Sequence, residues 1–154
     1  MKMKKIIIIG LLLIAPIQHV LAESKLEENS IYLGATANAN SYKAIYQLDQ
    51  ANPDIIKKAI RNINNALDDP RLKGKLKIEL IAFSGGTEAF LKGSPYEQDL
   101  KQLIERDVIV VQCSNSLKER KLNKDQLYDF IGYTPSGNGE LIIRASEGWV
   151  IVKP

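Results

Sequence analysis

The stretch "VIVVQCSNSLKER", from Val108 to Arg120, contains the feature of the sequence that decides the fold. Four successive apolar residues, Val108 to Val111, are followed, after Gln112 and Cys113, by serines, an asparagine and charged residues. A strand that is apolar at consecutive positions is buried on both faces, which is typical of a parallel sheet covered by helices. The stretch therefore predicts an α/β protein in which Cys113 lies at the carboxyl end of a buried strand.

Strand and helix patterns alternate on both sides of this stretch. Four more strands are predicted, at residues 42–48, 76–83, 132–134 and 149–153. Three longer helices are predicted, at residues 53–67 with Asn52 as cap, at 95–104 with Ser94 as cap, and at 136–146. Shorter helical segments are predicted at residues 87–91, 114–120 and 123–130. This alternation predicts a three-layer α/β/α domain around a mostly parallel five-stranded sheet.

The first 22 residues have the three parts of a secretory signal peptide. Lysines occupy positions 2, 4 and 5, an apolar run extends from Ile6 to Ile14, and the small residue Ala22 ends the segment. The apolar run is shorter than the roughly 18 residues that a membrane span needs, and Pro16 breaks the segment between this run and Ala22. We therefore predict cleavage after Ala22 and a periplasmic protein that has no stable membrane anchor.

Removal of this segment changes the charge of the protein. The full chain has 21 Lys and Arg residues against 18 Asp and Glu residues, but the segment takes three lysines and no acid with it, which leaves a balanced chain. Without a positive excess we predict no nucleic-acid partner. The one histidine, His19, is also removed, and this excludes Ser-His and Cys-His pairs and most zinc sites within one chain. We predict no metal and no cofactor.

The rest of the chain divides into a leader and one domain. Residues 23–41 are polar and rich in small residues, and we predict a flexible leader with one short ordered piece near residues 31–33. Residues 42–154 then form a single domain of ordinary size. Cys113 is the only cysteine of the chain, so an internal disulfide is impossible and the thiol is free or pairs with another chain.

Candidate site residues gather where the predicted strands end. Ligands of open parallel sheets bind in the crevice beyond the carboxyl ends of the strands. The residues at that edge are Asp49, Ser84, Gly85, Cys113, Ser114, Asn115, Ser116 and Ser136. The segment from Ser84 to Gly86 lacks the glycine spacing and the lysine of phosphate-binding loops, so we interpret it as a tight turn.

The position of Cys113 allows two interpretations. A helical turn that starts just after it would direct N–H groups at the sulfur and favour the thiolate, which is the reactive form. A free cysteine at a strand end is also often a buried packing residue. Position alone leaves both interpretations open.

Three segments in this order resemble the DsrE/DsrF-like family of small α/β proteins associated with sulfur transfer and sulfur oxidation. They are "ELIAFSGG" at residues 79–86, "SPYEQDLKQLIERDVIVVQCSNSLKER" at 94–120 and "YTPSGNGELIIRASEGWVIVKP" at 133–154. The resemblance implies a DsrE-like fold with a five-stranded parallel sheet, a homo-oligomer that is a trimer or a hexamer, and a cysteine that carries sulfur as a persulfide. Cys113 is the residue of this chain to which that role would fall.

Together with the export signal, the resemblance implies a periplasmic sulfur carrier or sulfurtransferase-like protein. Its Cys113 would hold sulfane sulfur as a persulfide and exchange it with small sulfur compounds or with a thiol acceptor protein. The alternative is a non-catalytic oligomeric protein that binds a small ligand in the same crevice, with Cys113 in its wall. A soft metal shared by three copies of Cys113 is a further variant, and the absence of a second ligand residue argues against it.

Overall fold

The computed structural model describes residues 24–154, so the predicted signal peptide at residues 1–22 and its cleavage site lie outside the described residues. Within the leader, residues 24–30 are helical, and the expected ordered piece near residues 31–33 is therefore misplaced. Thr36 ends this first unit of the chain, and Ala37–Pro154 form a second, compact unit. Between residues 24 and 154, no helix is both long and apolar enough to cross a lipid bilayer.

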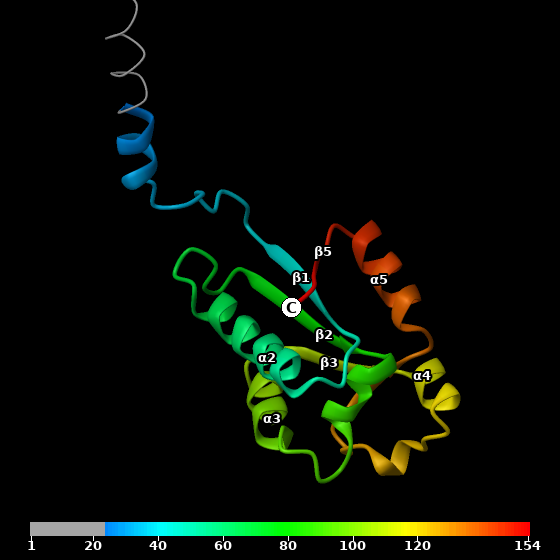
Figure 1. The fold of residues 1–154 in the computed structure, drawn as a ribbon. Coiled ribbons are helices and arrows are strands. Elements are labelled where there is room, and N and C mark those ends of the chain that lie inside the picture. The colour runs from blue at the N-terminus through cyan, green and yellow to red at the C-terminus, as the bar shows by residue number, and fades with distance from the viewer. Residues whose placement is uncertain (1–23) are drawn as a thin grey trace, which may run out of the picture. The chain divides into compact units, whose positions relative to one another are not determined.

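Five strands form a single sheet in the order β4-β3-β2-β1-β5 (Figure 1). Their bounds are β1 Tyr42–Leu48, β2 Leu76–Ala82, β3 Ile109–Cys113, β4 Gly132–Thr134 and β5 Val150–Val152. Every neighbouring pair of strands is parallel, so all five carboxyl ends lie at one edge of the sheet. The predicted five-stranded parallel sheet is confirmed.

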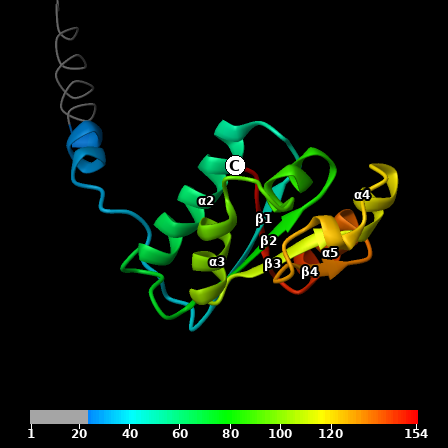
Figure 2. The same ribbon diagram turned by 90° about the horizontal axis from the view of Figure 1, so that it is seen from below.

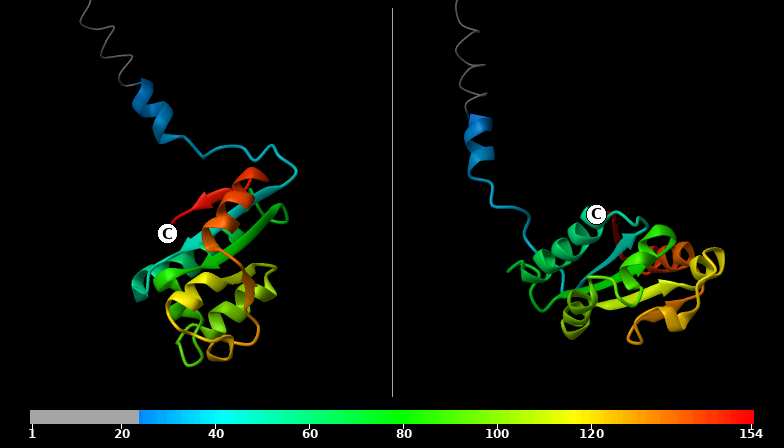
Figure 3. Two further views of the ribbon diagram at one scale, coloured as in Figure 1. Left: turned by 90° about the vertical axis from the view of Figure 1, so that its right-hand side faces the viewer. Right: turned by 60° about the horizontal axis from the view of Figure 1, so that its bottom comes forward.

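Helices cover both faces of the sheet (Figures 2 and 3). Helices α2 (Pro53–Asp68) and α3 (Glu97–Glu105) lie on one face, and α5 (Gly137–Ser146) lies on the other. The chain steps from β1 to β4 in one direction and then returns past β1 to β5, and right-handed crossovers place the returning helix on the opposite face. Short helical segments line the carboxyl edge: η1 (Ser84–Phe90), α4 (Ser114–Glu119) and η2 (Lys124–Gln126).

The core is thick on one face of the sheet and thin on the other. Between the sheet and α2 and α3, a large cluster contains fully buried side chains such as Leu80, Phe90 and Leu100. Burying each of these contributes about 1.5–3 kcal/mol. Under α5 the cluster is small, with four buried members: Ile45, Ile81, Leu141 and Trp149. Helix α5 therefore depends on other contacts to stay on the sheet.

Local signals placed some helix starts correctly and others not. Helix α2 begins as predicted, because the Asn52 side chain accepts the Asp54 N–H at 2.9 Å and Pro53 follows the cap. Helix α3 begins at Glu97 and not at Pro95, since the Ser94 hydroxyl donates to the Ala89 carbonyl at 2.8 Å. The helix expected at residues 123–130 shrinks to η2, because the chain then bonds to the η1 segment.

Candidate functional site

Cys113 is the last residue of β3, and the next residue, Ser114, begins α4. Alternation along the strand places its side chain on the same face as Val111, which packs in the cluster under α5. Only 4% of the Cys113 surface is exposed. The residue therefore lies at the predicted carboxyl edge of the sheet, but below the molecular surface.

Several hydrogen-bond donors converge on the Cys113 sulfur. The Gly137 N–H donates to Sγ at 3.1 Å, and the Ser116 N–H donates to it at 3.4 Å. The Asn115 N–H donates to the Pro135 carbonyl at 3.3 Å, and both this N–H and the Ser116 hydroxyl act on the acidity of the sulfur. Gly137 is the first residue of α5, so its N–H is one of the groups that a helix leaves without an internal acceptor. Two segments that are separate in sequence thus present donors to one atom.

These donors change the acidity of the thiol. Burial raises the pKa of Cys113, because a charged sulfur loses its hydration. The Ser116 hydroxyl and the N–H groups of Ser116, Gly137 and Asn115 act in the opposite direction and outweigh burial, so the pKa lies below its ordinary value. The site therefore favours the thiolate, the nucleophilic form of cysteine.

A second layer of contacts supports Ser116. Its Oγ accepts the backbone N–H of Ser84 at 2.9 Å. Ser84 has a φ of 50°, in the left-handed region that residues other than glycine rarely adopt. The Arg120 guanidinium donates to the Ser84 carbonyl at 3.0 Å and forms an ion pair with Glu88. The start of η1 is thereby tied to the segment that carries the cysteine.

Comparison with known proteins identifies relatives of this chain. Residues 36–154 match the model of the DsrE/DsrF-like family. The chain belongs to this family. It is also similar to the solved structure of MTH1491 from Methanobacterium thermoautotrophicum, a protein of unknown function, at 26% identity and a TM-score of 0.70, over 74% of this chain and 100% of that one. Curated proteins give no match. The predicted family and fold are confirmed.

The glycines of this DsrE/DsrF-like chain explain the turn after β2. A Cβ on Gly86 would lie 2.0 Å from the Leu48 carbonyl oxygen, so no larger residue fits there. Gly85 donates its N–H to the Asp49 carbonyl at 3.1 Å, and a Cβ on it would lie 2.8 Å from the Ala51 nitrogen. These contacts give both glycines a packing role against the end of β1.

The predicted site residues do not all meet at Cys113. Ser136 caps α5, where its Oγ accepts the Gly139 N–H at 3.1 Å and so orients the turn that contains Gly137. Asp49 follows β1, two strands away from β3, and its carboxylate accepts from Lys153 at 3.0 Å and from Gln47 at 3.2 Å. The structure thus gives Asp49 an ion pair of its own, away from the sulfur.

Gln112 belongs to the site but was missed in the sequence. It is fully buried, and its Nε2 donates to the Cys113 carbonyl at 2.9 Å and to Thr87 Oγ1 at 3.0 Å. Its Oε1 has no hydrogen-bond partner among residues 24–154. A half-satisfied buried amide is unfavourable for stability, so its place behind the cysteine indicates a role in holding the backbone there. The feature of the sequence that could have identified it was a glutamine inside an otherwise apolar strand.

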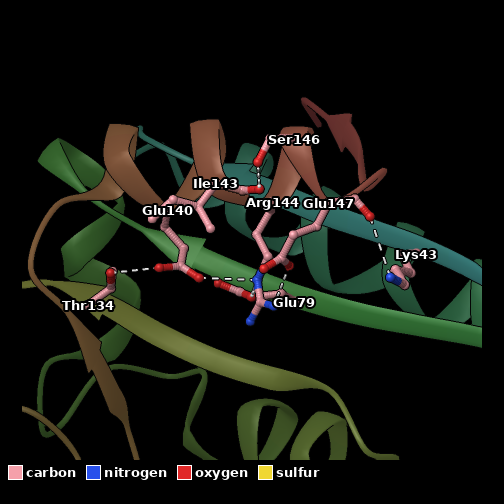
Figure 4. A network of polar contacts seen from close by, with 8 residues as sticks. All are labelled: Lys43, Glu79, Thr134, Glu140, Ile143, Arg144, Ser146 and Glu147. Atoms are coloured by element: carbon pink, nitrogen blue, oxygen red, sulfur yellow. Dashed lines mark hydrogen bonds and ion pairs between the residues drawn. The ribbon is translucent and has the colours of Figure 1, made fainter.

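An ionic network under α5 was also missed (Figure 4). Arg144 Nε donates to Glu79, which is only 1% exposed, at 2.8 Å and forms an ion pair with Glu140 at 3.1 Å. Thr134, the neighbour of Cys113 across the sheet, donates to Glu140 at 2.9 Å. Burial raises the pKa of Glu79 despite the opposing charge of Arg144. This network joins α5 to β2 and β4 where the apolar cluster is small.

Two further observations concern where a metal ion or a small ligand could bind to this family member. Within the described part of the chain, no group of three or more His, Cys, Asp or Glu residues is arranged to hold a metal ion. A surface hollow of about 560 Å³ opens beside the start of α2, where Lys57, Glu88 and Tyr96 are among its lining residues. Cys113 is not part of that lining.

Proposed function

We propose that this DsrE/DsrF-like protein is a periplasmic sulfur carrier that holds sulfane sulfur as a persulfide on Cys113. The observation that carries the proposal is the convergence of the Gly137 and Ser116 N–H groups on Sγ. A cysteine that serves only packing behaves as a small apolar side chain and needs no such donors. Donors of this kind stabilise an anionic sulfur, which both sulfur uptake and sulfur release require.

Thiosulfate illustrates the chemistry. The Cys113 thiolate attacks the outer sulfur of thiosulfate, the S–S bond breaks, and the electron pair leaves with sulfite. Cys113 then carries the outer sulfur as a persulfide. A thiolate of the acceptor attacks that sulfur, and Sγ leaves as the thiolate with the electron pair of the broken bond. No oxidant or reductant is consumed, so one cysteine is sufficient.

The surroundings of Cys113 favour small donors. The sulfur lies below the surface, and exposed residues of the neighbouring segments include the uncharged Ser84, Asn115 and Pro135. A small sulfur compound approaches a sulfur that is only 4% exposed more readily than the surface of a folded protein does. The same burial is the observation that favours the second candidate function, a non-catalytic binding protein in which Cys113 is a wall residue.

Mass spectrometry distinguishes the two functions. Protein purified from the periplasmic fraction is incubated with thiosulfate or polysulfide, and its intact mass is measured before and after a reducing agent is added. We expect a reducible gain of one sulfur atom that is absent from Cys113→Ser and retained in Ser114→Ala. If the wild-type protein gains no sulfur and a small alkylating reagent does not reach the native thiol, the carrier function is wrong and the wall-residue function stands.

A further inference from the structure

The Ser116 hydroxyl lies between a fixed donor and the cysteine sulfur. A hydroxyl has one proton to donate and two lone pairs that accept. One lone pair of Ser116 Oγ accepts the Ser84 N–H at 2.9 Å, which leaves the hydroxyl proton for an acceptor. Cys113 Sγ lies beside Ser116, since the Ser116 N–H donates to it at 3.4 Å, and the Ser116 side chain lowers the pKa of Cys113. Ser116 and Cys113 are 5% and 4% exposed, so water competes little for these bonds.

The donor that orients Ser116 is itself held in place. Ser84 keeps its left-handed φ of 50° although a glycine would adopt it more readily. Its backbone is fixed on both sides of Cα, because the N–H bonds to Ser116 and the carbonyl accepts from Arg120 at 3.0 Å. Arg120 is fixed in turn by its ion pair with Glu88. Sparsely populated backbone conformations persist where surrounding contacts hold them, and they are common at functional sites.

We propose that Ser116 is a positioning residue that directs its hydroxyl proton at Cys113 Sγ, and that Arg120 fixes the Ser84 backbone, whose N–H orients this hydroxyl. The inference rests on the proposed sulfur chemistry at Cys113 and adds to it. The hydroxyl stabilises the thiolate that attacks the sulfur donor. It also stabilises the same thiolate when it leaves as sulfur passes to the acceptor, because a more stable thiolate is a better leaving group.

The test is a pH titration of the thiolate in the absence of any sulfur donor. Thiolate formation is followed by its ultraviolet absorbance, with Cys113→Ser as the baseline. Ser116→Ala should titrate at higher pH than the wild type and form about tenfold less thiolate at a pH below the midpoint, since a hydrogen bond to a charged group is lost. Arg120→Lys should shift the midpoint less but in the same direction, because a lysine cannot bond Ser84 and Glu88 with one planar fork.

Two control variants separate this role from a general effect of mutation. Although Ser114 was predicted at the site, its side chain makes no hydrogen bond with another residue that the structure describes. Ser114→Ala therefore makes the same chemical change two residues earlier in α4, and we expect no shift. Ser84→Gly keeps the N–H that reaches Ser116 and removes the backbone strain, so its midpoint should also stay at the wild-type value. A Ser114→Ala shift as large as that of Ser116→Ala would overturn the proposal, as would a wild-type midpoint in Ser116→Ala. If Ser116→Ala does not fold, an unshifted Arg120→Lys overturns it.

The titration and the sulfur-uptake experiment can fail separately. A shifted midpoint in Ser116→Ala together with no sulfur uptake by the wild type contradicts the sulfur-carrier function and leaves the positioning of the thiolate intact. Sulfur uptake by the wild type together with an unshifted midpoint contradicts the role of Ser116 alone.

Discussion

The Cys113 sulfur receives hydrogen bonds from two parts of the chain that reach it by different routes. Ser116 lies in the turn that directly follows the cysteine, so its N–H is close whenever α4 forms. Gly137 comes from the start of α5, and its N–H reaches Sγ only when that helix is docked on the sheet. The acidity of the thiol is therefore sensitive to the position of α5.

The first prediction concerns Gly137. A Cβ at this position would lie 2.9 Å from the Phe83 ring, so Gly137→Ala must displace either the ring or the start of α5. We expect the hydrogen bond to Sγ to weaken, the pKa of Cys113 to rise, and the free energy of unfolding to fall by about 1–3 kcal/mol. Thiolate titration and urea denaturation measure the two effects.

Gly139→Ala is the matched control for this prediction. A Cβ on Gly139 would meet the Ser136 side chain at 3.3 Å, a closer contact than usual but not a clash with a ring. We expect its thiol to titrate like that of the wild type. Equal shifts in the two variants would contradict the special position of Gly137.

At the scale of elements, α5 has two roles. Its first residue, Gly137, donates a hydrogen bond to the cysteine, and its Arg144 forms most of the ion pairs on that face of the sheet. Arg144 contacts Glu79 and Glu140 through Nε and Glu147 through Nη1, and its guanidinium lies over the Trp149 ring at 4.5 Å from the centroid. Three carboxylates thus share one cation. The cation keeps α5 in register with β2, and this register sets where the helix start lies.

The second prediction removes that cation. Arg144→Met keeps the length of the side chain but leaves Glu79 buried without a counter-charge. We expect the free energy of unfolding at neutral pH to fall by roughly 3–5 kcal/mol, the usual effect of breaking a buried ion pair from one side. The double variant Glu79→Gln with Arg144→Met should recover most of this loss in urea denaturation. No recovery would show that the arginine acts through packing on Trp149.

The third prediction is the pH dependence that Glu79 gives to stability. Because burial raises its pKa in the folded state above the ordinary value of 4.5, the folded protein binds the proton more tightly than the unfolded chain does. The stabilisation from the protonated form is complete below pH 4.5 and is lost as the pH rises through the folded-state pKa. Denaturation over this pH range should show the loss in the wild type, and Glu79→Gln should lack it. A Glu79→Gln curve parallel to that of the wild type would assign the pH dependence to other groups.

The elements that local signals control could be predicted from the sequence. Consecutive apolar residues in β3 and the Asn52 cap of α2 gave the sheet and the helix start, because these signals act within a few residues. Ser94 has the same capping signal, yet a tertiary bond to the Ala89 carbonyl uses its hydroxyl. Local chemistry does not show which distant acceptor a polar side chain will find.

The same distinction holds for the site. Cys113, Ser116 and Ser84 were placed at one edge because parallel strands end together. The roles of Gly137 and Arg144 depend on how α5 docks, which no short-range pattern of the sequence contains. Gln112 and Glu79 were visible as polar residues within apolar strands, but their partners lie 25 and 65 positions away in the sequence.

For the whole molecule, the uneven covering of the sheet leaves apolar surface on one side. Ile142 and Ile143 of α5 are 70% and 54% exposed, and Ile109 and Ile151 on the same face of the sheet are 43% and 45% exposed. Exposed apolar residues that cluster often mark an interface between proteins. We propose that a second copy of the chain covers this surface in the trimer or hexamer that the family resemblance implies.

The fourth prediction tests that assembly by placing a charge on the exposed side of α5. Ile142→Glu leaves the core intact, because the core residue of this turn is Leu141, but it would bury an unpaired carboxylate in any interface formed there. We expect the wild-type protein to have the mass of an oligomer in light scattering and Ile142→Glu to have the mass of a monomer, with unchanged secondary structure. Leu26→Glu, which changes an equally exposed leader residue, should remain oligomeric. A monomeric wild type, or an oligomer that persists in Ile142→Glu, would show that the subunits do not meet through α5.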